Sequence, residues 1–154
     1  MNCILGVFCE NFTVYYGTKE SGMTRINHIA ILVEDIEDAL PFWRDALGLE
    51  LGEFEEVEIE KAKVAFFPTG ESRIELVQPT DPETSLGRYL SKHGGGMHHI
   101  CLEVPDIEAS LSRLKTHGVE LINDTPRQRD SGTRYAFIHP KSTGGVLVEL
   151  YQLP

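Results

Sequence analysis

Cysteines, basic residues and long apolar runs are all scarce in this chain of 154 residues. Its three cysteines, Cys3, Cys9 and Cys101, form no CxxC pair, so we expect reduced thiols and a cytoplasmic protein. No apolar run approaches the roughly 20 residues that a membrane span requires. The 14 basic and 24 acidic residues give a net charge of −10, which argues against a nucleic-acid partner. An anionic small substrate stays compatible, because a local cluster of arginine and lysine can override the global sign.

The first 22 residues differ from the rest of the chain. They have no basic segment and no clear cleavage site, so they do not resemble a signal peptide. We expect residues 1–22 to be a poorly ordered N-terminal extension. Residues 23–152 are then expected to form a single domain, which is an ordinary length for one.

An internal repeat organises this domain. HIAILVEDIEDAL (28–40) and HICLEVPDIEASL (99–111) are identical at seven of thirteen positions, 71 residues apart. The final strands, IELVQ (74–78) and VELYQ (148–152), also match, with three extra residues that a hairpin loop would absorb. Such a repeat indicates two modules, at about 24–80 and 97–152, joined by a linker.

Each module has the same local pattern. An apolar strand is followed by an aspartate, Asp35 or Asp106, that suits a helix N-cap. Apolar residues at helical spacing come next, then a glycine, Gly48 or Gly118, that suits a left-handed helix end. Pro41 should kink the first helix or shift its start. Three β-rich segments complete a βαβββ unit, and two such units predict an α+β fold with a cupped, open, barrel-like sheet around a central site.

Four polar residues recur at equivalent places in the two modules. His28 and His99 begin the first strand of each module, and Glu75 and Glu149 lie inside apolar runs of the last strand. Burying a lone glutamate is costly unless it is paired or bound to a metal. Two imidazoles and two carboxylates that converge on a pseudo-twofold axis suit a divalent metal such as Co, Ni, Mn or Zn. Strand alternation places His98, the partner of Asn27, on the opposite face, away from the metal.

With these residues in view, the chain resembles the vicinal oxygen chelate superfamily over residues 24–152. Three stretches resemble the methylmalonyl-CoA epimerases within it: NHIAILVEDIEDALPFWRDALGLE (27–50), LSKHGGGMHHICLEV (90–104) and HPKSTGGVLVEL (139–150). The resemblance implies that His28, Glu75, His99 and Glu149 bind the metal. It also implies an acyl-CoA substrate and a homodimer.

The implied reaction interconverts (S)- and (R)-methylmalonyl-CoA by removal and return of the C2 proton through a metal-stabilised enolate. Glu149 is the candidate proton carrier on one face of the substrate, and Glu75 is the candidate on the other. Some relatives have a further carboxylate in the strand that here reads AKVAF (62–66), and this chain has no acid there. Lys141, Ser142, Arg134 and Lys92 are candidate substrate-binding residues.

Two alternatives stay open. Glyoxalase I (lactoylglutathione lyase) uses the same four ligand types, although the turn HPKSTGG favours the epimerase. A non-catalytic ligand-binding module of the same fold is the other alternative, and the full set of four ligand candidates argues against it.

Overall fold

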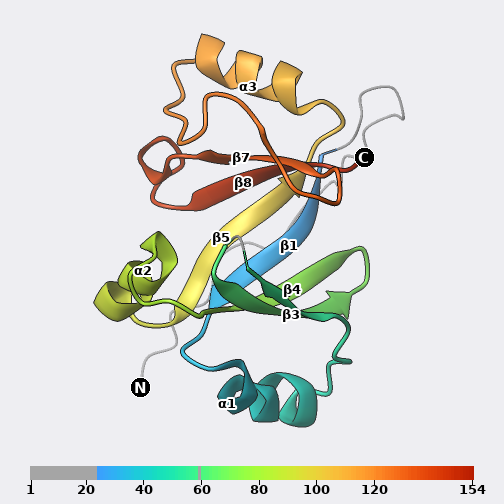
Figure 1. The fold of residues 1–154 in the computed structure, drawn as a ribbon. Coiled ribbons are helices and arrows are strands. Elements are labelled where there is room, and N and C mark those ends of the chain that lie inside the picture. The colour runs from blue at the N-terminus through green and yellow to red at the C-terminus, as the bar shows by residue number, and fades with distance from the viewer. Residues whose placement is uncertain (1–23, 59) are drawn as a thin grey trace, which may run out of the picture.

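The structure is a computed structural model that describes residues 24–58 and 60–154 (Figure 1). The predicted extension, residues 1–22, lies outside the described residues. The elements along the chain are β1 (Arg25–Leu32), α1 (Ile36–Leu40), a π-helix (Pro41–Ala46), β2 (Phe54–Val57), β3 (Ala62–Thr69), β4 (Ser72–Pro79), α2 (Ser85–His93), β5 (Gly96–Glu103), α3 (Ile107–Thr116), β6 (Arg127–Gln128), β7 (Arg134–Ile138), a 3-10 turn (Pro140–Ser142) and β8 (Leu147–Gln152).

The strands form one eight-stranded sheet in the order β2-β3-β4-β1-β5-β8-β7-β6. β1 and β5 pair antiparallel at its centre and join the two modules. In each module the first strand pairs parallel with the last, β1 with β4 and β5 with β8, and the other strands follow as antiparallel hairpins. The predicted fold of two βαβββ modules in one cupped sheet is confirmed.

The predicted helix ends are also confirmed. The side chains of Asp35 and Asp106 accept hydrogen bonds from backbone amides three residues on, at 3.2 and 2.9 Å. Gly48 and Gly118 have φ of 73° and 71°, the left-handed conformation that ends each helix. Pro41 has no N–H to continue the α-helix, so α1 ends at Leu40 and a π-helix follows.

Helices α1 and α3 cover the outer face of the sheet at its two ends (Figure 1). Ile36 and Leu40 of α1 pack against Phe67 and Leu76, while Ile107 of α3 packs against strands of the second module. These two apolar layers leave the inner, concave face for the polar residues. None of the described helices is long and apolar enough to cross a membrane.

Helix α2 lies in the segment that the sequence analysis treated as a linker. Thr84 is its N-cap and accepts a hydrogen bond from the amide of Gly87 at 3.0 Å. Leu86 and Leu90 pack against a cluster of inner-face residues that includes Val64 and Val77. The helix therefore closes one end of the concave face.

Candidate metal centre and its cavity

The four residues singled out by the repeat come together at the centre of the sheet. They lie on its four middle strands: His28 on β1, Glu75 on β4, His99 on β5 and Glu149 on β8. The Nε2 atom of His28 lies 3.1 Å from Nε2 of His99, 3.3 Å from Glu75 and 3.4 Å from Glu149. Nε2 of His99 is 3.1 Å from Glu149. The pseudo-symmetry of the two modules produces this convergence.

The donor set fits a divalent metal ion. All four side chains are buried, and His28 and Glu149 are only 2% and 1% exposed. Two imidazole nitrogens and two carboxylates gathered this closely are ligands that Zn²⁺, Co²⁺, Ni²⁺ and Mn²⁺ accept. Oε1 of Glu149 is buried and has no hydrogen-bond partner among the described residues, as expected for an atom that binds something else.

Burial and hydrogen bonding act in opposite directions on the two glutamates. Burial by itself would raise the pKa of Glu149, but hydrogen bonds from His28 and His99 outweigh it and bring that pKa to about 2. For Glu75 burial dominates, and its pKa is raised despite the nearby histidines. Glu149 is therefore the carboxylate that the protein itself holds in the charged form.

The orientation predicted for His98 is wrong. In the β1–β5 pairing, Ile26 faces Leu102 and His28 faces Cys101, while Ala30 faces His99 and Ile31 faces Met97. Asn27 and His98 are thus extra residues at two irregularities of the ladder, where strand alternation does not hold. His98 lines the cavity instead of facing away from it.

These two extra residues, Asn27 and His98, contact the candidate ligand histidines. The side chain of Asn27 lies 2.9 Å from Nδ1 of His28, and Nδ1 of His98 lies 2.9 Å from Nδ1 of His99. Burial, and then His99, lower the pKa of His98 to about 4, so it is neutral near pH 7. Each contact leaves Nε2 of the ligand histidine directed at the centre, as second partners of metal ligands do.

Cys101 also lies at this centre. It takes the place of Ala30 in the repeat, is fully buried, and has its Sγ atom close to the ligand atoms of His28 and Glu149. Burial raises the pKa of its thiol well above the ordinary value. The residue is therefore a neutral, buried thiol beside the centre.

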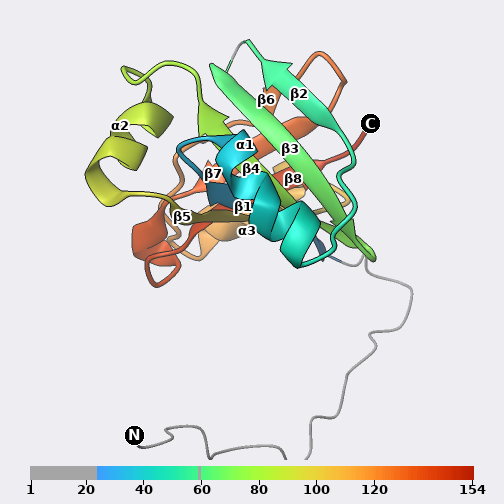
Figure 2. The ribbon, with the colours of Figure 1, turned by 90° about the horizontal axis from the view of Figure 1, so that it is seen from below.

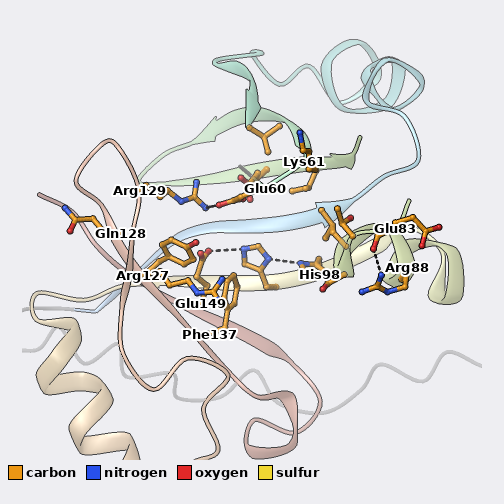
Figure 3. A pocket seen from close by; sticks show the side chains of 18 residues that line it. Glu60, Lys61, Glu83, Arg88, His98, Arg127, Gln128, Arg129, Phe137 and Glu149 are labelled. Atoms are coloured by element: carbon orange, nitrogen blue, oxygen red, sulfur yellow. Dashed lines mark hydrogen bonds and ion pairs between the residues drawn. The ribbon is translucent and has the colours of Figure 1, made fainter. Parts of the chain in front are cut away.

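A cavity of about 930 Å³ opens above the four residues (Figure 3). Its lining includes Glu75, His99 and Glu149 on the floor. Its wall holds four basic residues, Lys61, Arg88, Arg127 and Arg129, beside two carboxylates, Glu60 and Glu83. A cavity of this size with several cations in its wall suits an anionic ligand of cofactor size.

The cavity wall contains a carboxylate that the sequence analysis missed. Glu60 lies in the turn between β2 and β3, just before the stretch 62–66 in which an acid was sought. It forms an ion pair with Arg129, from Nη2 to Oε1, of 2.9 Å. The only signal in the sequence was an acid at a turn, which is ordinary for surface loops.

The four residues predicted to bind substrate do not line this cavity. Lys141 lies 3.9 Å from Glu120, and the hydroxyl of Ser142 accepts a hydrogen bond from the Glu120 amide. Arg134 pairs with Glu108, and Lys92 lies in the last turn of α2. Contacts between these side chains and a more distant part of a substrate stay a prediction.

Known proteins share both the sequence and the fold. The profile of the glyoxalase/bleomycin resistance protein/dioxygenase superfamily matches residues 27–137. Mouse mitochondrial methylmalonyl-CoA epimerase is 37% identical over 83% of this chain and 72% of its own. The ethylmalonyl-CoA/methylmalonyl-CoA epimerase of Cereibacter sphaeroides is 37% identical over 84% and 98%. A solved methylmalonyl-CoA epimerase, in complex with methylmalonyl-CoA and NH4+, superposes with a TM-score of 0.77 at 33% identity, covering 84% of this chain and 94% of its own.

Proposed function

Because the chain belongs to the methylmalonyl-CoA epimerase family of the glyoxalase/bleomycin resistance protein/dioxygenase superfamily, we propose that it epimerises methylmalonyl-CoA at C2. The observation that carries the proposal is the convergence of two histidines and two glutamates at the base of a cavity that Glu75, His99 and Glu149 line. Since the relative from Cereibacter sphaeroides is named for ethylmalonyl-CoA as well, the substrate class is a 2-alkylmalonyl-CoA.

His28, Glu75, His99 and Glu149 would hold the metal. A divalent ion there supplies a Lewis acid that stabilises negative charge developing on the substrate when C2 loses its proton. The buried histidines and their partners Asn27 and His98 keep the nitrogen donors in place. Co, Ni, Mn and Zn all fit the donor set, and metal analysis of the purified protein identifies the ion that it holds.

Inversion at C2 needs one group that removes a proton and another that returns it on the opposite face. Glu149 is one of these proton carriers. It lies on the floor of the cavity, its Oε1 atom is unpaired among the described residues, and its carboxylate is charged. Glu75, predicted as the second carrier, lies on the same floor within 3.3 Å of His28. Glu60 enters the cavity from the turn before β3 in the first module, whereas Glu149 lies on β8 of the second (Figure 3). We therefore propose Glu149 and Glu60 as the pair, with Glu75 as the alternative second carrier.

The test is proton exchange and inversion in deuterated water. Metal-loaded protein is mixed with (S)-methylmalonyl-CoA, deuterium at C2 is followed by mass spectrometry, and the R isomer is followed with a stereospecific coupled assay. We expect exchange with inversion that a chelator abolishes and the same metal restores. No exchange, together with turnover of the methylglyoxal–glutathione adduct, would assign the chain to glyoxalase I chemistry instead.

We also propose that the protein is a cytoplasmic homodimer. Exposed apolar side chains such as Phe42, Leu47 and Phe54 on the first module are compatible with an interface. Light scattering coupled to gel filtration measures the mass directly, and a monomer at micromolar concentration would refute the dimer.

A further inference from the structure

The two free edges of the sheet meet over the metal centre. β2 and β6 are the outermost strands of the sheet, and both edges lie on the same side of the molecule when it is seen from below (Figure 2). The turn after β2 contains Glu60 and the turn after β6 contains Arg129. Their ion pair of 2.9 Å therefore joins the first module to the second at the mouth of the cavity (Figure 3).

Arg129 lies over a wall of aromatic rings. Its guanidinium is 5.2 Å from the ring centre of Tyr135 and 5.3 Å from that of Tyr151. The ring of Tyr151 is in turn 5.5 Å from the ring of His28. One aromatic side chain, Tyr151, thus separates the guanidinium from the candidate metal ligand His28. The rings of Tyr135 and Tyr151 hold the guanidinium in a fixed orientation.

The guanidinium of Arg129 has N–H donors that its ion pair with Glu60 does not use. Its contact with Glu60 is made by Nη2, while Nε is buried and has no hydrogen-bond partner among the described residues. A planar guanidinium that presents Nε and an Nη side by side suits bidentate contact with a carboxylate. Glu60 is 34% exposed, so its carboxylate can be released to water at little cost.

We propose that Arg129 is a specificity-determining residue that binds the free carboxylate of the acyl-CoA. When the substrate carboxylate binds, it replaces Glu60 as the ion-pair partner of Arg129. The proposal rests on the proposed function and names how the same cavity selects a carboxylated thioester. The substrate carboxylate brings its own negative charge to a guanidinium that is already partly buried and oriented. Release of Glu60 from its ion pair then leaves the Glu60 carboxylate free to accept a proton.

The test compares two thioesters that differ only in the carboxylate, methylmalonyl-CoA and propionyl-CoA. Calorimetry on metal-loaded protein measures both affinities for the wild type, Arg129→Gln and Arg129→Lys. We expect Arg129→Gln to reduce the affinity for methylmalonyl-CoA by about 10-fold or more, because a charge-assisted contact is lost. The affinity for propionyl-CoA should fall by less than about 2-fold. Arg129→Lys keeps the positive charge but lacks the paired N–H donors of the guanidinium. Its affinity for methylmalonyl-CoA should fall by an intermediate factor.

Two further variants make the test specific. Arg127→Gln is the matched control, because Arg127 lines the same cavity two residues away and should affect both thioesters alike. Glu60→Gln removes the competing carboxylate, so methylmalonyl-CoA should bind several-fold tighter and propionyl-CoA unchanged. The melting temperature and metal content of each variant check the fold.

The outcomes separate the two claims. Equal weakening of both thioesters by Arg129→Gln, or weaker methylmalonyl-CoA binding in Glu60→Gln, overturns the role of Arg129 and leaves the epimerase proposal standing. Failure of the wild type to bind either thioester overturns the proposed function itself. If Arg129→Gln does not fold, the comparison rests on Arg129→Lys and Glu60→Gln, and unchanged discrimination in both overturns the proposal.

Discussion

The two modules supply equivalent residues to the candidate metal site but surround them with different partners. In the first module the amide of Asn27 contacts His28, whereas in the second the imidazole of His98 contacts His99. Arg73 donates to Asn27 as well, at 2.9 Å. The residue two positions after each histidine also differs, being Ala30 in one module and Cys101 in the other.

Other features of the modules are unchanged. Gln78 and Gln152, in the last strand of each module, accept hydrogen bonds from the first helical amides of Ile36 and Ile107 at 3.0 and 2.9 Å. The elements that place the four polar residues on the sheet are therefore duplicated, while the residues that contact the two histidines have diverged. A pseudo-symmetric frame can thus hold a site whose two halves differ.

The largest expected effects test the equivalence of the two ligand histidines. His28→Ala and His99→Ala should each reduce metal affinity by more than about 100-fold, beyond the effect of losing a supporting contact. Metal content by plasma mass spectrometry and activity should fall together. Retention of full metal content by one of the two variants would show that the modules do not contribute equally.

The second prediction distinguishes Glu60 from Glu75 as the second proton carrier. Glu60→Gln should reduce inversion by about 100-fold or more while C2 exchange with retention continues through Glu149. Its metal content should stay unchanged, because Glu60 is not among the four ligands. Glu75→Gln serves as the comparison, and it should lose metal. Normal inversion by Glu60→Gln would return the role of second carrier to Glu75.

A smaller effect concerns the supporting contacts. Asn27→Ala and His98→Ala should each weaken metal binding by about 10-fold, because the Nδ1 partner that orients each ligand is lost. Competition with a chelator of known affinity measures the difference. If His98→Ala binds metal like the wild type while Asn27→Ala does not, only the first module depends on its supporting residue.

Cys101→Ala makes the second module more like the first at the position of Ala30. Removal of the buried sulfur leaves a small cavity, so the free energy of unfolding should fall by about 1–2 kcal/mol in denaturant titrations. Cys101→Ser should cost more, since it buries a hydroxyl in the same space. Equal stability of Cys101→Ala and the wild type would show that the cavity closes by relaxation.

The smallest effect lies where the two modules join. Arg25 donates to Glu103 at 2.9 Å across the β1–β5 pairing. Partial burial would raise the pKa of Glu103, but the hydrogen bonds from Arg25 and Asn27 lower it overall. Its contribution to stability is therefore present above the unfolded pKa of about 4.3 and lost as the pH falls through the lower folded value.

Glu103→Gln should lower the melting temperature by about 1 °C at pH 7, because an ion pair this exposed contributes little. The difference should disappear in scans at acidic pH. A difference that persists there would mean that the side chain acts through packing and not through its charge.

Much of the fold and the convergence of the four polar residues could be predicted from the repeat. Duplicated aspartates and glycines marked the helix ends, and duplicated histidines and glutamates marked the candidate ligands, because local conformation and equivalent placement depend on short stretches of chain. Helix α2 was missed because the three glycines that follow it (Gly94–Gly96) favoured a linker, although Leu86 and Leu90 at helical spacing and a cap at Thr84 marked it. The substrate-binding candidates were chosen as cationic or hydrogen-bonding residues, and that choice ignores which strand ends face the cavity.

By itself the sequence determined that two βαβββ modules place two histidines and two glutamates at matching positions. Only the tertiary structure decided the orientation of His98 and the meeting of Glu60 with Arg129. The first depends on irregularities in the β1–β5 pairing, which shift strand alternation without any mark in the spacing of residues. The second depends on the curvature of the whole sheet, which brings its two most distant edges together over the metal centre.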